Sequence, residues 1–147
     1  MTRVSPRSGT GNGRARQRAV AGRRAGVQTS TDGVVIRAAR RADLDQVIAI
    51  DASVTGVEKR SYWLSVFRRY GDGEQPERHF LVAETGGRVA GFIIGEVRDW
   101  EFGAPPCGWV FAIDVAPEFR LAGIATRLLQ ALRAGFRRSG VRKLRTI

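Results

Sequence analysis

Residues 109–136 decide the fold and read WVFAIDVAPEFRLAGIATRLLQALRAGF. The apolar run over 109–115 predicts a mostly buried strand, which Pro117 ends because proline cannot donate a ladder hydrogen bond. An amphipathic helix follows, and its apolar residues recur at every fourth position: Ile124, Leu128, Leu132 and Phe136. The stretch therefore predicts a strand, a turn and a helix in direct succession.

The beginning of this helix is suited to binding an anion. Its first turn has no Ser, Thr, Asp or Asn in a capping position, so the first backbone N–H groups lack an internal partner. Gly123 removes a side chain where a ligand would approach, and Arg120 adds a positive charge just before the turn. Free amides, the helix dipole and an arginine together predict a phosphate site, here a candidate cradle for a pyrophosphate.

The spacing Arg-x-x-Gly-x-Ala over residues 120–125 resembles the signature of the GNAT family of N-acetyltransferases. In that signature Gln or Arg, then Gly, then Gly or Ala occupy these positions. The context supports the resemblance, because the motif lies between an apolar strand and a helix. Residues 115–120 and 123–125 are also similar to the N-terminal protein acetyltransferases of the ribosomal-protein type. An ordinary strand–turn–helix connection is the alternative interpretation of the segment.

Length and composition narrow the class of protein. The 147 residues suffice for one domain, and no apolar stretch is long enough to span a bilayer, so no membrane association is expected. One cysteine, Cys107, and one histidine, His79, exclude a disulfide framework and most zinc sites, so no metal is expected. These features are typical of a protein of the reducing cytoplasm.

The net charge of +11 is concentrated at the N-terminus, where residues 1–29 hold seven arginines and no acidic residue. Residues 1–30 also contain almost no large apolar side chains, so we expect a disordered basic tail there and a folded domain over 31–147. Contact with nucleic acid, a transit peptide and a dispensable extension all remain open for this tail. Nucleic acid is expected as a partner through the tail only.

Hydrophobic periodicity predicts the other elements of the domain. Strands are expected over 34–37, 80–83, 89–97 and 141–147, and helices from Asp43 and over 58–69. The second helix should place Tyr62, Trp63, Val66 and Phe67 on one apolar side. The resulting order, β-α-α-β-β-β-α-β, predicts an α/β (α+β) architecture with a mixed sheet. It resembles the GNAT acyl-CoA N-acyltransferase fold through its first five strands, over about residues 34–147.

The chain departs from that family in two places. GNAT proteins normally continue past the fifth strand with a helix and two more strands, so a C-terminally incomplete fold, truncated after strand five, is expected. The additional helix usually carries a tyrosine that acts as a general acid, whereas Tyr62 and Tyr70 here belong to the second helix. Leu121 stands where many relatives have glycine, and a positive φ there would strain leucine.

The resemblance implies that acetyl-CoA is the co-substrate and that an amine attacks its thioester directly. The pyrophosphate would contact Arg120 and the backbone amides of Leu121, Ala122, Gly123, Ile124 and Ala125. The pantetheine arm would lie along the backbone of residues 112–115, where the N–H of Ile113 or Val115 would polarise the thioester carbonyl. The acceptor would be a protein N-terminus or a small amine.

Acetyl transfer also needs a carboxylate, or a water held by one, to remove a proton from the amine. Some relatives place a glutamate early in the fourth strand, but Trp109 stands at the matching position. The candidate catalytic acids are Asp114 and Glu101. Glu101 has aromatic neighbours in the sequence, which would raise its pKa. The alternatives are that Asp114 forms a turn or pairs with Arg120, that Glu101 is a solvated loop carboxylate, and that Glu96 faces outward from its strand.

Two functions therefore follow from the sequence. The first is an acetyl-CoA-dependent N-acetyltransferase acting on an amine. The alternative is a truncated, non-catalytic module that binds coenzyme A or acts through protein contacts, which the missing C-terminal segment favours.

Overall fold

The computed structural model describes residues 33–99 and 101–146, without the side chain of Glu101. The strands are β1 (Val35–Ala38), β2 (Arg78–Thr85), β3 (Arg88–Arg98), β4 (Cys107–Val115) and β5 (Leu144–Thr146). The helices are α1 (Leu44–Thr55), α2 (Arg60–Tyr70) and α3 (Ile124–Arg138), with short 3-10 turns η1 (Arg41–Asp43), η2 (Glu101–Gly103) and η3 (Pro117–Phe119). The predicted element order is confirmed. The predicted tail over 1–30 lies outside the described residues.

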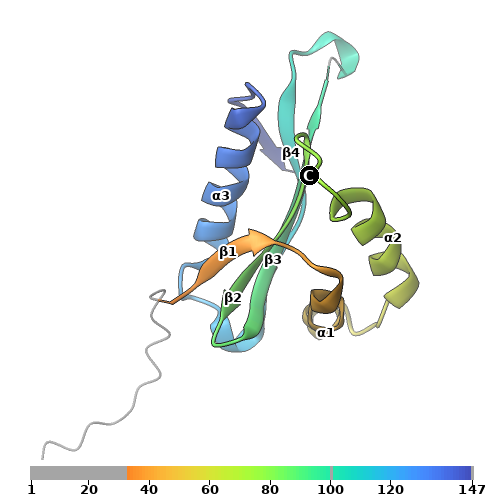
Figure 1. The fold of residues 1–147 in the computed structure, drawn as a ribbon, viewed down its shortest axis with the longest axis vertical. Helices are drawn as coiled ribbons and strands as arrows, with labels where there is room; N and C mark the ends of the chain where they lie inside the picture. Colours follow the sequence, from red (N-terminus) through yellow and green to blue (C-terminus); the bar gives the residue numbers. More distant parts are fainter. Residues whose placement is uncertain (1–32, 100, 147) are drawn as a thin grey trace, which may run out of the picture.

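The five strands form one mixed sheet in the order β1-β2-β3-β4-β5. The first four strands pair antiparallel, and β5 pairs parallel to β4. Helix α3 covers one face of the sheet, whereas α1 and α2 cover the other (Figure 1). This arrangement is the predicted mixed fold class. Among the described residues, no helix has the length and apolar character needed to cross a membrane.

Helix α3 packs on the sheet through its predicted apolar stripe. Four residues of the stripe are at most 2% exposed: Ile124, Leu128, Leu132 and Phe136. The ring of Phe136 lies directly on Gly108 of β4, where a Cβ atom would collide with it. Gly108 therefore allows the close approach of α3 to the sheet that this packing needs.

Aromatic packing fills the opposite face of the sheet. Trp63 and Phe67 of α2 are buried against Phe80, and Trp63 also lies edge-on to Phe92 with ring centroids 5.1 Å apart. The prediction that Tyr62 shares this side is wrong, because 57% of Tyr62 is exposed. The buried side of α2 is centred on Trp63, Phe67 and the half-buried Tyr70, and Tyr62 lies about 100° from Trp63 around the helix, at the margin of that side.

Asp43 begins α1 without capping it. It occupies the N-cap position, but its side chain makes no capping hydrogen bond there. Its carboxylate instead accepts hydrogen bonds from Arg37 at 2.7 and 2.8 Å and from the backbone N–H of Arg40 at 2.7 Å. The bond from Arg37 is the main reason why the pKa of Asp43 is lowered. Asp43 therefore ties β1 to the turn before α1.

Candidate functional site: an open strand edge beside a helix N-terminus

One edge of β4 is paired over only part of its length. Strand β3 pairs with β4 over Cys107–Val115, whereas β5 pairs only with Gly108–Val110. A β-bulge separates the two parts, because the register shifts between Ile94 and Gly95 of β3 and leaves Phe111 without a partner residue. Beyond the bulge, no other described strand pairs with β4 on the β5 side. We call this part of β4 the open edge.

The open edge presents the backbone groups of Ile113 and Val115. Ala116, just after β4, donates its N–H to the carbonyl oxygen of Ala90 at 2.7 Å. Hydrogen bonds of an antiparallel ladder alternate along a strand, so the N–H of Asp114 also points toward β3. The N–H groups of Ile113 and Val115 therefore point away from β3, toward the open edge.

Helix α3 begins without a cap, as the sequence predicts. No side chain caps it, and no acidic residue lies in its first turn. The turn before it holds Leu121 at φ 63° and the N-cap residue Gly123 at φ 76°, so Leu121 has the backbone conformation that strains leucine. The backbone N–H groups of residues 121–125 donate to no other described residue. These groups are available to an anion.

Arg120 links the open edge to the start of α3. Its Nε donates a hydrogen bond to the carbonyl oxygen of Val115 at 3.2 Å. Its guanidinium therefore adds positive charge next to both the strand edge and the free amides. The alternative that Arg120 forms an ion pair with Asp114 is wrong, because none of the ion pairs among the described residues joins them.

Asp114 lies on the face of the sheet that α1 and α2 cover, because it stands opposite Phe92, which belongs to that core. Burial raises the pKa of Asp114, and the charge of Asp51 adds to the effect, while two nearby basic side chains oppose it. Asp51 of α1 is itself buried, accepts a 3.0 Å hydrogen bond from Nε1 of Trp63 and pairs with Lys59 at 3.0 Å. No spacing in the sequence points to Asp51, because its partners come from the next helix and from the loop between α1 and α2.

Glu96 does not face outward, contrary to one sequence expectation. It is 7% exposed and pairs with Arg98 at 3.3 Å and with Arg78 at 3.5 Å. Tyr70 lies nearby at the end of α2, and its pKa is raised by burial and then by the charge of Glu96. Two guanidinium groups lie within ion-pair distance of the Glu96 carboxylate, so Glu96 belongs to a structural network. Glu96 and Arg98 are two residues apart, which puts them on one face of β3, and this spacing is the feature of the sequence that indicates their ion pair.

The second predicted catalytic acid, Glu101, begins the turn η2 in the loop between β3 and β4. Its side chain lies outside the described part of the chain, so its role stays a prediction. Cys107, where β4 begins, is buried and is not part of a disulfide. Within residues 33–99 and 101–146, no group of three His, Cys, Asp or Glu residues could hold a metal ion.

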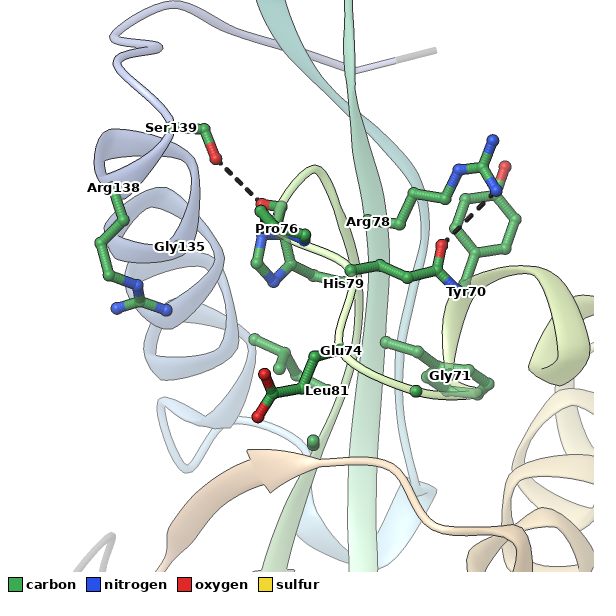
Figure 2. Close-up of a pocket in the computed structure, with 14 residues that line it drawn as sticks. Tyr70, Gly71, Glu74, Pro76, Arg78, His79, Leu81, Gly135, Arg138 and Ser139 are labelled. Carbon is green, nitrogen blue, oxygen red and sulfur yellow. Dashed lines mark hydrogen bonds between the residues drawn. The ribbon is translucent and has the colours of Figure 1, made fainter.

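A cavity of about 440 Å³ lies away from the open edge, between the end of α2, the beginning of β2 and the last turn of α3 (Figure 2). His79 lies in it and donates from Nε2 to the carbonyl oxygen of Pro76 at 3.1 Å, and Ser139 donates to the same oxygen at 2.9 Å. Burial is the main cause that lowers the pKa of His79, and the charge of Arg138 contributes. Because one carbonyl binds both donors, His79 does not activate Ser139, and the cavity holds no Ser-His-Asp arrangement.

Comparison with known families gives one result. The family profile described as "Acetyltransferase (GNAT) family" matches residues 44–147. No curated protein sequence matches the chain significantly.

Solved structures share the fold at low sequence identity. The aminoglycoside N-acetyltransferase AAC(6')-Iy in complex with CoA has a TM-score of 0.66 and 20% identity, over 78% of this chain and 76% of that one. A transcriptional regulator from Bacillus halodurans C-125 has a TM-score of 0.66 and 15% identity, over 78% and 81% of the chains. Glucosamine-6-phosphate N-acetyltransferase from Arabidopsis thaliana has a TM-score of 0.64 and 15% identity, over 78% and 81%. At these identities the likeness shows the fold alone.

Proposed function

Because the chain belongs to the acetyltransferase (GNAT) family, we propose that it transfers the acetyl group of acetyl-CoA to an amine. The observation that carries this proposal is the adjacency of an open strand edge and an uncapped helix N-terminus, linked by Arg120. An acyl carrier with a diphosphate near one end and a thioester at the other matches both features at once.

The diphosphate of acetyl-CoA would be held at the start of α3. The N–H groups of residues 121–125 have no other described acceptor, and the positive end of the helix dipole favours an anion there. The left-handed conformations of Leu121 and Gly123 alternate with ordinary ones, which gathers successive N–H groups into a concave anion site. The guanidinium of Arg120 would complete the neutralisation.

The chemical step would take place at the open edge. The N–H of Ile113 or Val115 would donate to the thioester oxygen while negative charge develops on it. The amine nitrogen forms a bond to the carbonyl carbon, the C–S bond breaks, and coenzyme A leaves as a thiolate that then takes up a proton. The chain itself forms no covalent intermediate in this scheme.

Asp114 is our first candidate for the base that takes the proton from the amine. It lies on the strand between the two candidate oxyanion donors, and a raised pKa suits a proton acceptor near neutral pH. Glu101 is the second candidate, on the strength of its aromatic neighbours in the sequence.

The acceptor class has two candidates. Aminoglycoside and glucosamine-6-phosphate N-acetyltransferases share this fold, which favours a small amine. The sequence of residues 115–125 favours a protein N-terminus instead. The neighbouring carboxylates of Asp114 and Asp51 suit a cationic acceptor of either kind.

Calorimetric titration of acetyl-CoA into the full chain tests the binding step. We expect micromolar binding that is lost in Arg120→Glu and in Gly123→Glu, which place negative charge at the diphosphate site. Arg68→Glu on α2 changes the net charge by the same amount as Arg120→Glu and should leave binding unchanged. Gly123→Asn is the second control, because asparagine tolerates a positive φ and carries no charge.

An amine screen with the same protein then tests turnover. Acetylation of any amine that fails in Arg120→Glu supports the enzyme. Binding of acetyl-CoA with no transfer to protein N-termini, polyamines or aminoglycosides would instead support the non-catalytic module. Absence of binding by the folded protein would overturn the proposal as a whole.

A further inference from the structure

The last part of the chain contains basic residues and no acidic ones. Residues 120–147 contain eight arginine and lysine residues and no aspartate or glutamate. The acidic side chains of the protein all precede this segment, so charge is distributed unevenly along the folded domain. Arg120 belongs to the acetyl-CoA site proposed above. The remaining basic residues lie on α3, on β5 and between them.

Four of these residues gather around one shallow hollow. Arg133 and Arg137 come from the second half of α3, and Arg142 and Lys143 come from the loop before β5; all four line the hollow and are exposed. We call these four side chains the basic surface. Arg133 and Arg137 stand four residues apart on a helix, where like charges repel. The fold therefore tolerates a repulsion that its own packing does not require.

The basic surface has no acidic partner within the described residues. All ion pairs of the described chain use basic side chains from other elements: Arg37, Lys59, Arg60, Arg78, Arg88 and Arg98. The exposed Arg88, for instance, pairs with Glu118 at 2.7 Å across two elements. The four charges of the basic surface thus remain available to an anion from outside the chain.

The basic surface is separate from the proposed acetyl-CoA site. With a rise of about 1.5 Å per residue, Arg133 and Arg137 lie about 14 and 20 Å along α3 from its first residue. Their charges therefore stand near the opposite end of the helix from the free amides. A diphosphate at the start of α3 would not reach them.

The kind of partner follows from what the surface lacks. The large exposed apolar residues of the described chain are Val35, Val54, Val57, Tyr62, Phe102, Ile113 and Leu121, and none belongs to the basic surface. A protein interface needs an apolar core and a membrane-binding surface needs apolar anchors, whereas recognition of a phosphate backbone needs mainly clustered Arg and Lys. We propose that the basic surface binds the phosphate backbone of a nucleic acid. The seven arginines of residues 1–29 would add to the same electrostatic attraction.

Fluorescence anisotropy with a labelled single-stranded 20-nucleotide RNA, titrated with the 147-residue chain at several salt concentrations, tests this proposal. We expect Arg133→Gln/Arg137→Gln to weaken binding on the order of tenfold at low salt and to lower the salt slope by about 1.4, for two lost phosphate contacts. Arg142→Gln/Lys143→Gln should act alike, and Arg133→Lys/Arg137→Lys should retain binding. Each variant keeps the N-terminal arginines, so their contribution is constant.

The matched control is Arg41→Gln/Arg68→Gln, two exposed arginines on other elements with no ion pair to a described residue. It lowers the net charge by the same amount and should leave affinity and salt slope unchanged. An equal loss in this control would overturn the proposal, because net charge or the N-terminal arginines would then explain the binding. Binding to anionic vesicles or to a polyglutamate peptide but not to RNA or duplex DNA would overturn it in favour of another partner.

Discussion

The first part of β4 is paired on both sides, whereas the part beyond the bulge is paired on one side only. In the first part, Gly108 lies under Phe136, and the guanidinium of Arg98 lies over the ring of Trp109, with Cζ 5.4 Å from the ring centroid. In the second part, Ile113 is 39% exposed and its N–H points to the open edge. One strand thus serves the core and the candidate site, and a single extra residue at Phe111 marks the change.

Free backbone groups on a strand edge invite pairing with another chain, so an exposed edge needs a reason to persist. Here the edge runs into the uncapped start of α3, and Arg120 binds Val115 at the point where they meet. The comparison suggests that the first part of β4 carries stability and the second part carries ligand binding. Substitutions in each part should separate these two properties.

Proline at Ile113 should have the largest effect on activity. Ile113→Pro removes an N–H that points to the open edge and no hydrogen bond to β3, so we expect kcat/KM for acetyl transfer to fall by about 10²–10³-fold with little change in Tm. Ala112→Pro is the matched control, because its N–H belongs to the ladder with β3 and its loss should lower Tm strongly. Full activity in both Ile113→Pro and Val115→Pro would contradict an oxyanion role for this edge.

Alanine at Gly108 should lower stability through one defined contact. The new Cβ atom would collide with the ring of Phe136, and such overpacking costs about 1–3 kcal/mol of unfolding free energy. Chemical denaturation of the variant measures this loss. Gly108→Ala/Phe136→Leu should recover part of it, since the smaller side chain makes room. Losses that simply add in the double variant would show that the Phe136 contact is not the cause.

Glycine at Leu121 should stabilise the protein slightly. Leucine in the left-handed conformation costs about 1–2 kcal/mol, and the fully exposed side chain of Leu121 loses no packing when it is removed. We expect Leu121→Gly to raise Tm while acetyl-CoA affinity stays the same, because the backbone N–H is retained. Ala122→Gly, at a position without a positive φ, should lower Tm instead. Lower stability in Leu121→Gly would mean that the strain is not present.

The strand, turn and helix of residues 109–136 were predictable because their signals are local. Each signal involves only neighbouring residues: the apolar run for the strand, Pro117 for its end, and the four-residue spacing from Ile124 to Phe136 for the helix. The absence of a capping residue is also visible in the sequence itself. The positive φ of Leu121 followed from comparing one position with the family pattern.

Other features depend on contacts between distant residues, which periodicity does not encode. The bulge at Phe111 depends on the register between β3 and β4, and without it the open edge could not be located. The burial of Glu96 depends on Arg78, which belongs to another strand and is distant in the sequence. The position of Asp51 depends on a hydrogen bond from Trp63, which lies on the next helix.

The smallest expected effect concerns the pH dependence of acetyl transfer. Burial raises the pKa of Asp114, and the charge of Asp51 adds to the effect. Asp114 must be deprotonated to act as the base, so activity should fall as the pH drops through that raised pKa. Asp51→Asn keeps an oxygen for the Trp63 hydrogen bond and removes the charge, so the acid limb of kcat/KM should move to lower pH while the plateau stays similar. Asp114→Asn should abolish that limb together with most of the rate. If the limb stays in place in Asp51→Asn and disappears in Glu101→Gln, the base is Glu101, and the second part of β4 supplies only backbone donors.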